Sequence, residues 1–325
     1  MFFRAFVMGV TEKNTKPTHN QHGGNKMQNQ VETLKKLTYG TELELESITR
    51  RRAAEAVQGV VGGTIAYKGG TYDAWTVTAP DGRVWKMMSD ASLSSRSNSA
   101  EVVTPILRWE DMDTLQEVVR ALRRAGATTP RTTSQHIHVG AGEMTVAQLV
   151  NLVKMEYKQE ELLIKSLGTH ETRLARYCRR TDAAFIERLE RRRPKTMREL
   201  NECWYGHYNE NPTHYDNSRY AFLNLHATLT KGTVEWRGPN GSLHAGEVKA
   251  RIVLALAMTA KAINAKCTSC RNRREYSPVS AKYDARILLL HLGLSGDEFK
   301  NVRMHLLKNL PGSAAWKNGR PAVAA

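Results

Sequence analysis

The sequence predicts a fold in which short strands and amphipathic helices occur together in one chain. Glutamate and leucine alternate in residues 38–46, which is the two-residue period of a β-strand. Asp81 and Gly82 form a hairpin turn signal within residues 64–88, which otherwise have the composition of strands. Residues 111–125 have the apolar spacing of an amphipathic helix. The length of 325 residues is enough for one large domain or two small ones, and a single folded unit of this size can bury a sizeable core.

The composition is basic. The 48 lysines and arginines exceed the 32 aspartates and glutamates, so the formal net charge is +16. Such a charge suits an anionic partner such as nucleotide phosphate, nucleic acid or an acidic polymer, and it does not choose among them. No apolar run is long enough to span a membrane, so we expect no membrane partner. Cys267 and Cys270 form a lone CxxC without a second pair to complete a zinc site, and we expect reduced thiols and a cytoplasmic location.

Three carboxylates share one face of the first predicted strand. Glu42, Glu44 and Glu46 alternate with Leu43 and Leu45, which share the opposite face. Carboxylates in a row repel one another unless positive charge lies over them. Water and salt would suffice on an exposed strand, because polar residues commonly face solvent in half-buried sheets. A divalent cation held by hard oxygen ligands is the second interpretation, and the strand alone leaves both open.

Two further strands carry candidate ligands. Residues 100–105 contain Glu101 in an apolar run that a proline stops. Residues 134–140 contain His136 and His138, which are two positions apart and therefore share one face of a strand. Such a pair indicates either a structural role or a contact to a metal ion or phosphate.

Strands and helices also alternate in the rest of the chain. We predict helices over residues 50–57, 145–167, 244–266 and 284–293, and a last helix that a capping box at residues 295–298 opens and that runs to about Asn309. Residues 219–226 and 233–237 are predicted strands. The second of them places Glu235 and Arg237 on one face, where a simple ion pair is the alternative to a functional role.

Three segments differ from the predicted core. Residues 1–37 are predicted to form a disordered N-terminal tail, because they are largely polar, and residues 311–325 a C-terminal tail. Residues 169–218 are rich in arginine and then, from Trp204 to Tyr215, in aromatic residues. Either a solvated helical excursion or a binding patch fits this composition.

In their order along the chain, these motifs resemble the amidoligase family of the glutamine synthetase and glutamate–cysteine ligase superfamily, whose members are often found in phages and mobile elements. The resemblance runs from about Tyr39 to about Ile263. It is carried by residues 39–45, Trp85 with 89–93, 100–105, 134–139, Arg219 with Tyr220, Asn224 with Leu225, 233–237 and 240–243. At Ala91, Ala100 and Gln135 the family pattern has glycine instead, which we interpret as three lost turn glycines.

The resemblance implies an α+β fold, with a curved, mainly antiparallel sheet of the glutamine synthetase catalytic-domain type and helices packed on its outer face. The concave face of this sheet would carry the acidic site. The catalytic domain would cover residues 38–310, with residues 169–218 as an arginine-rich insertion.

The resemblance also implies an enzyme, an ATP- and Mg²⁺-dependent carboxylate–amine ligase that forms an amide bond through an acyl phosphate. Phosphoryl transfer needs positioning and neutralisation of developing charge, which carboxylate-bound magnesium supplies. The implied metal ligands are Glu42, Glu44, Glu101, His136 and Glu235. His138 and Arg237 are the implied catalytic residues, which would bind phosphate of the nucleotide. Arg219 and Asn224 would contact nucleotide or substrate.

The expected partners are ATP and a carboxylate and an amine substrate, for which the family analogy suggests peptides, cell-wall components or a protein. A phage-encoded enzyme would act in the host cytoplasm. The rival interpretation is a nucleic-acid-binding or structural phage protein on a decayed ligase fold. The net charge and the arginine-rich segment favour this rival, whereas the intact glutamate and histidine motifs oppose it, so a nucleic-acid partner is not favoured.

Overall fold

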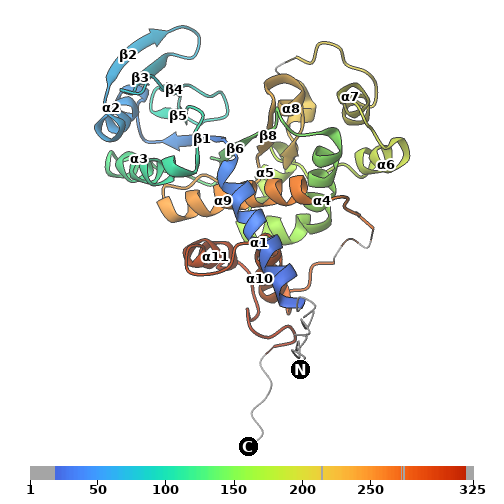
Figure 1. The fold of residues 1–325 in the computed structure, drawn as a ribbon. Helices are drawn as coiled ribbons and strands as arrows, with labels where there is room; N and C mark the ends of the chain where they lie inside the picture. Colours follow the sequence, from blue (N-terminus) through green and yellow to red (C-terminus); the bar gives the residue numbers. More distant parts are fainter. Residues whose placement is uncertain (1–18, 214, 272, 274, 320–325) are drawn as a thin grey trace, which may run out of the picture.

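The fold is mixed α+β and is built on one antiparallel sheet of eight strands that does not close on itself (Figure 1). The computed structural model describes residues 19–213, 215–271, 273 and 275–319. The strands are β1 (Tyr39–Glu46), β2 (Thr64–Gly69), β3 (Ala74–Thr78), β4 (Val84–Met88), β5 (Ser99–Val103), β6 (Gln135–Gly140), β7 (Leu223–Asn224) and β8 (Thr233–Trp236). Their order in the sheet is β2-β3-β4-β5-β1-β6-β8-β7.

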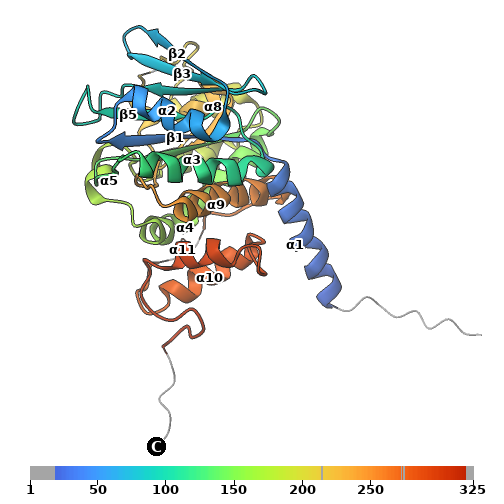
Figure 2. The ribbon, with the colours of Figure 1, turned by 90° about the vertical axis from the view of Figure 1, so that its left-hand side faces the viewer.

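Helices pack around this sheet. They are α1 (His19–Lys36), α2 (Arg50–Val61), α3 (Met112–Arg124), α4 (Val146–Leu167), α5 (Glu171–Arg176), α6 (Ala183–Arg192), α7 (Met197–Tyr205), α8 (His226–Lys231), α9 (Ala245–Asn264), α10 (Ala281–His291) and α11 (Lys300–Leu307). Helix α2 packs on β3, β4 and β5, and α3 and α9 lie beneath the sheet in Figure 1. Figure 2 shows α10 and α11 as a further layer, on the side of α9 that faces away from the sheet.

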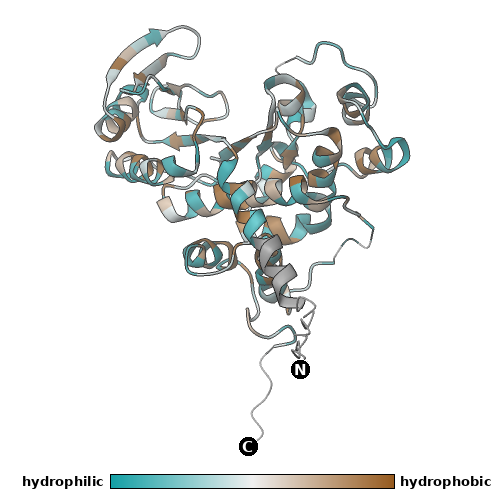
Figure 3. Cartoon of the chain, viewed as in Figure 1, coloured by the Kyte–Doolittle hydropathy of each residue, from teal (hydrophilic) through white to brown (hydrophobic). Residues whose placement is uncertain are grey.

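The core lies between the sheet and these helices. Leu43 and Leu45 of β1 point into it and are 1% and 0% exposed, as the alternation in the sequence predicts. Helix α3 contributes its apolar face, and Leu115 and Leu122 on that face are fully buried. Figure 3 shows that α2 and α3 carry both hydrophobic and hydrophilic residues, which is the pattern of helices packed on one side.

The predicted hairpin forms at Asp81 and Gly82, between β3 and β4. Gly82 has a φ angle of 83°, a left-handed conformation that residues with a Cβ atom rarely adopt. Strand β1 is central: it pairs with β5 along Glu42–Glu46 and with β6 along Tyr39–Leu43. Side chains on the face of β1 opposite the core are therefore flanked by both neighbouring strands.

The structure corrects the tail predicted over residues 1–37. Helix α1 occupies residues 19–36 and contacts α9, and residues 1–18 lie outside the described residues. Leu34 is fully buried, and the Gln30 side chain donates a hydrogen bond to the Ala257 carbonyl at 3.0 Å. The physical reason is that Val31 and Leu34 give the end of this polar segment a short apolar stripe that α9 covers.

The strand predicted over residues 219–226 is wrong for most of its length. Only Leu223–Asn224 form a strand among these described residues, and α8 begins at His226. Asn224 explains the break, because its Oδ1 accepts a hydrogen bond from the backbone N–H of His226. An asparagine that bonds to the backbone two residues later favours a turn over a continuing strand.

The arginine-rich segment 169–218 forms three helices, α5, α6 and α7, followed by a loop, and His214 in that loop lies outside the described residues. At the C-terminus, residues 311–319 contain no helix or strand, and residues 320–325 lie outside the described residues. Across the part of the chain that the structure describes, none of the helices has the length and apolar character needed to cross a membrane.

Candidate active site

The strand registers bring the candidate residues into adjacent rows on the face of the sheet opposite the core. Glu42 of β1 lies between Val103 of β5 and His136 of β6. Two residues further along β1, Glu44 lies opposite Glu101 of β5. Side chains on directly paired residues point to the same face, so these carboxylates and the histidine share it.

A second row continues across the sheet from β6. His138 lies opposite Glu235 of β8, and Glu235 lies opposite Asn224 of β7. Five strands, β5, β1, β6, β8 and β7, therefore place their polar side chains on one face. The sequence could predict the face of each residue but not this pairing.

Glu42 is the centre of the cluster, because each of its oxygens faces a histidine. Glu42 Oε2 is 3.1 Å from His136 Nδ1, and Glu42 Oε1 is 3.2 Å from His138 Nε2. The other ring nitrogen of His136 bonds to Ser134 Oγ at 2.8 Å, and that of His138 bonds to Thr233 Oγ1 at 2.9 Å. These outer hydrogen bonds fix the orientation of both rings, as is usual for ligating histidines.

Two groups of three potential metal ligands share Glu42. The first is Glu42, Glu101 and His136, and the second is Glu42, His138 and Glu235. Within each group, one ligand atom from every residue lies within 4.8 Å of the others. The shared carboxylate places two potential cation positions side by side, which is the arrangement of a two-metal site.

Glu235 is held by two partners. Its Oε1 accepts a hydrogen bond from Arg237 Nη1, and its Oε2 accepts one from Asn224 Nδ2, both at 2.6 Å. Arg237 Nε in turn donates to the Tyr177 carbonyl at 3.1 Å. The ion pair that the spacing suggested is thus present, but it is buried inside the site.

The remaining glutamates of β1 have different roles. Glu44 Oε2 accepts a hydrogen bond from the backbone N–H of Ser134 at 2.7 Å. Glu46 accepts hydrogen bonds from the backbone N–H and the hydroxyl of Ser94, at 2.8 and 2.7 Å. Glu46 therefore anchors the loop after β4, and it belongs to neither group of potential ligands.

The two rows of polar residues form the floor of a cavity of about 630 Å³, which we call the cleft. Its volume is in the range of sites that bind ligands the size of a nucleotide. Every predicted site residue except His138 lines the cleft, and His138 reaches Glu42 from its edge. Lys86 of β4 also lines it, on the same face as the carboxylates.

One wall of the cleft is a column of alternating cationic and aromatic side chains. The Arg219 guanidinium lies 5.4 Å from the ring centroid of Tyr215 and 5.0 Å from that of Tyr220. Arg237 lies 5.7 Å from the same Tyr220 ring. At the mouth, the hydroxyls of Tyr215 and Tyr72 are 2.8 Å apart, so this wall meets the loop between β2 and β3.

Arg173 of α5 supports this wall from behind and is 1% exposed. Its Nη2 donates to the Arg237 carbonyl at 2.7 Å, and its Nη1 donates to the carbonyls of Gly238 and Pro239 at 3.0 and 2.9 Å. Sequence reasoning missed this residue, because nothing distinguishes it from the exposed arginines around it. Lys86 was missed too, although the alternation in β4 could have placed it on the carboxylate face.

Charge interactions divide the carboxylates into two kinds. Burial raises the pKa of Glu101, and the nearby charge of Glu42 raises it further. Burial also opposes ionisation of Glu235, but Arg237 and the histidines outweigh this effect and bring its pKa to about 2. Hydrogen bonds from His136 and His138 likewise outweigh burial at Glu42 and hold its pKa well below the usual value. The rise at Glu101 reflects repulsion from Glu42, which a cation bound between the two carboxylates would relieve.

A family model described as "putative amidoligase enzyme" matches residues 35–259. The chain belongs to this amidoligase family. Among solved structures, a bifunctional glutathione synthetase from Pasteurella multocida is similar, with 11% sequence identity and a TM-score of 0.39. That match covers 90% of this chain and 49% of the synthetase, so the chain spans about half the length of that protein. No curated protein matches the chain.

The three departures from the amidoligase glycine pattern do not all lie at turns. Ala91 lies in the turn after β4, but Ala100 is inside β5 and Gln135 begins β6. Gln135 Nε2 donates a hydrogen bond to the Val248 carbonyl at 3.4 Å, so its side chain ties β6 to α9. The interpretation of three lost turn glycines is therefore corrected, because two of these positions have extended backbone that any residue can adopt.

Proposed function

We propose that this protein is an ATP- and Mg²⁺-dependent carboxylate–amine ligase that forms an amide bond through an acyl phosphate. The observation that carries the proposal is the pair of ligand groups sharing Glu42 on the floor of the cleft. Membership of the amidoligase family supports the ligase class. As part of the same proposal, the sheet is of the glutamine synthetase catalytic-domain type.

The residues present fit the implied metal. Carboxylate oxygens are the ligands that Mg²⁺ and Mn²⁺ prefer, and Glu42, Glu101 and Glu235 supply them. His136 and His138 add nitrogen donors whose rings are already oriented. Mg²⁺ bound by these residues would neutralise the charge of phosphate oxygens during phosphoryl transfer. Glu44 is the further proposed ligand, at the edge of the first group.

Two steps make up the proposed reaction. A carboxylate oxygen of one substrate forms a bond to the γ-phosphorus of ATP, and the bond from this phosphorus to the β–γ bridging oxygen breaks, releasing ADP. The amine nitrogen of the second substrate then bonds to the carbonyl carbon of the acyl phosphate, phosphate leaves, and the nitrogen loses a proton. The cleft provides positioning and fixed charge for both steps.

The wall of the cleft supplies cations for this chemistry. Arg237 is the proposed catalytic contact to a phosphoryl group, with a planar fork that suits two oxygens. His138, beside Glu42 and Glu235, is proposed to face phosphate as well, and the negative charge of both glutamates outweighs burial to raise its pKa. Arg219 and Asn224 complete the proposed nucleotide or substrate contacts.

We also propose that the segment 169–218 contributes to substrate choice. Tyr177 and Tyr215 of this segment line the cleft, and Arg173 supports its wall from behind. Side chains from a loop at the mouth of a site commonly contact the variable part of a substrate. Peptides, cell-wall components and proteins remain the proposed substrate classes, and the proposed location is the cytoplasm.

The test is to incubate the purified full-length chain with ATP, Mg²⁺ and pools of amino acids and short peptides. Release of ADP and phosphate together with a product heavier by an amide linkage is the expected result. Glu101→Gln, which removes one proposed ligand, should abolish both signals. ATP-independent binding to DNA that weakens steeply with salt, without turnover in any pool, would instead favour a nucleic-acid-binding protein.

A further inference from the structure

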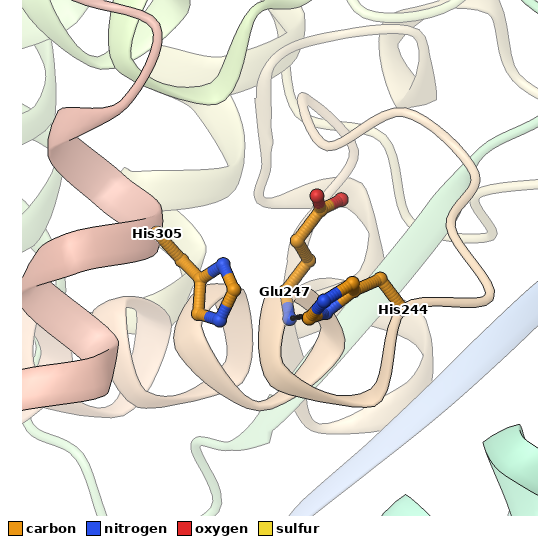
Figure 4. A group of neighbouring side chains, drawn as sticks. All are labelled: His244, Glu247 and His305. Atoms are coloured by element: carbon orange, nitrogen blue, oxygen red, sulfur yellow. Dashed lines mark hydrogen bonds between the residues drawn. The ribbon is translucent and has the colours of Figure 1, made fainter.

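A third group of potential metal ligands lies outside the cleft, where α11 packs on the start of α9. His244 is the N-cap residue of α9, Glu247 lies in its first turn, and His305 comes from α11 (Figure 4). One ligand atom from each residue lies within 4.8 Å of the other two. The two imidazole rings meet edge to face with their centroids 4.8 Å apart, and in Figure 4 the Glu247 side chain extends upward from α9, with its carboxylate above the two rings.

We propose that His244, Glu247 and His305 bind a zinc ion that joins the C-terminal helices to the catalytic body. Two imidazole nitrogens and one carboxylate oxygen form a ligand set typical of Zn²⁺, with a fourth position left for water. This set differs from the carboxylate-rich groups in the cleft, which suit Mg²⁺. The zinc site is separate from the proposed ligase chemistry.

The carboxylate of Glu247 already faces a cation and is already oriented. The Lys308 ammonium contacts Glu247 Oε1 and occupies the place of a positive ion there. Glu247 Oε2 accepts a hydrogen bond from Ser242 Oγ at 2.8 Å and lies 3.4 Å from Arg251 Nη2. Outer contacts of this kind orient ligating carboxylates in metal sites. Lys308 is 44% exposed, so its ammonium can move into water when a metal ion takes its place.

The helix leaves space for both rings. A Cβ atom on Gly246 would lie 2.5 Å from His305 Nε2 and 3.2 Å from His244 Cε1, so any larger residue would push the rings away. Gly246 is the second residue of α9, and the close approach of the rings explains the absence of a side chain there. A cavity of about 10 Å³, lined in part by Glu247, His305 and Lys308 but not by His244, lies beside the group.

The two histidines are suited to ligation in their present state. The His305 ring lies against the His244 ring, so its ring nitrogens are close to the other two proposed ligands. Within the described chain, no hydrogen bond is made by the His305 ring. His244 Nδ1 accepts the Glu247 N–H at 3.3 Å, a long and therefore weak contact that a bond to zinc can replace.

The test measures Zn²⁺ binding to the metal-free full-length chain by competition with a coloured chelator, with Mg²⁺ in excess to occupy the cleft. His305→Gln and His244→Asn each remove one ligand, and asparagine preserves the helix N-cap. We expect each change to weaken Zn²⁺ binding at one site by at least about tenfold. Removing only an outer hydrogen bond to a metal ligand typically costs that much metal affinity. His291→Asn, on the exposed surface of α10, is the matched control and should leave binding unchanged.

Lys308→Met supplies a test in the opposite direction. Removing the competing ammonium should tighten Zn²⁺ binding and enlarge the increase in melting temperature that zinc produces. Equal zinc affinity in the wild type and in both histidine variants would overturn the site, because any bound zinc would then belong to the cleft. Weaker binding by Lys308→Met would overturn it as well.

Discussion

Arg237 and Glu235 form a buried ion pair on the floor of the cleft, with 2.6 Å between Arg237 Nη1 and Glu235 Oε1. Both side chains are less than one-tenth exposed, at 9% and 6%. Removing one partner of such a pair leaves the other charged and buried, which is strongly unfavourable. Arg237 therefore stabilises the proposed active site. Both the free energy of unfolding and the activity of an Arg237 variant must be measured.

The first prediction concerns Arg237→Lys. Lysine keeps the charge but cannot bond to Glu235 and the Tyr177 carbonyl together, so one buried acceptor loses its partner. We expect the free energy of unfolding to fall by ~1–3 kcal/mol, measured by urea denaturation. ATP turnover should fall on the order of tenfold or more, because the fork for phosphoryl oxygens is lost.

Arg83→Lys is the matched control for this prediction. Arg83 is partly exposed and pairs with Asp111 outside the cleft. We expect Arg83→Lys to change the free energy of unfolding by less than ~1 kcal/mol and to leave ATP turnover unchanged. If Arg237→Lys kept wild-type turnover, the phosphate-binding role would be wrong and only the structural role would remain.

The second prediction compares two glutamates on the same face of β1. Glu42 belongs to both ligand groups, whereas Glu46 holds the Ser94 loop and belongs to neither. Glu42→Gln should weaken Mn²⁺ binding, followed by electron paramagnetic resonance, by at least ~10-fold. Glu46→Gln should leave Mn²⁺ affinity unchanged, because its amide oxygen can still accept from Ser94. Similar losses in the two variants would mean that the strand contributes only general negative charge.

The third prediction uses a carboxylate pair on α4, away from the cleft. Glu156 and Glu160 are buried at 0% and 1% exposure, and burial is the main cause that raises the pKa of each. The charge of Glu160 adds to the rise at Glu156, and Arg273 opposes it. A pKa that is higher in the folded state than in the unfolded state favours folding while the group is protonated. This contribution is complete below the unfolded pKa, near 4.5, and is lost as pH rises through the folded pKa.

Glu156→Gln removes this pH dependence. Its amide oxygen can still accept the hydrogen bond from Thr181 Oγ1, so packing is preserved. We expect the variant to be more stable than the wild type at pH 8 by at least ~1 kcal/mol, and nearly equal to it at pH 4.5. Glu161→Gln on the same helix should behave in the opposite way, because a hydrogen bond from Arg180 lowers the pKa of Glu161. Equal pH profiles for Glu156→Gln and the wild type would contradict the prediction.

The sequence predicts which face of the sheet carries the candidate site residues better than it predicts the segments around them. Alternation alone placed Leu43 in the core and Glu42 on the opposite face, and spacing alone placed His136 and His138 together. These inferences hold because a strand fixes the face of every second residue. Which strands lie next to one another depends on long-range pairing, and the neighbouring positions of Glu101 and Glu235 followed only from the resemblance to a family.

Two of the errors came from residues whose neighbours are distant in sequence, and one has a local cause. Leu34 reads as part of a polar tail until α9 is there to cover it. The local cause is Asn224, which ends β7 because its side chain accepts a hydrogen bond from the backbone N–H of His226, two residues later. The arginines of the segment 169–218 look alike in sequence, and burial of one of them depends on carbonyls more than sixty residues away.

The last prediction tests the difference between those arginines. Arg173 is fully buried and donates to three consecutive carbonyls, from Arg237 to Pro239, whereas Arg191 on α6 is exposed. Arg173→Lys provides one ammonium where the carbonyls need two nitrogens, so at least one buried acceptor is left unsatisfied. We expect the free energy of unfolding to fall by ~3 kcal/mol. Arg191→Ala should stay within ~0.5 kcal/mol of the wild type.

Stability alone would not show that Arg173 supports the cleft, so nucleotide affinity is measured in the same variants. Arg173 fixes the backbone of Arg237, and both are on the wall that is proposed to bind phosphate. If Arg173 affects ATP binding by positioning Arg237, the double variant Arg173→Lys, Arg237→Lys should lose less ATP affinity than the product of the two single-variant fold-losses. Arg191→Ala combined with Arg237→Lys should give the simple product, because the two residues share no contact. Independent effects of Arg173 and Arg237 on ATP affinity would leave Arg173 with a role in folding but none in the site.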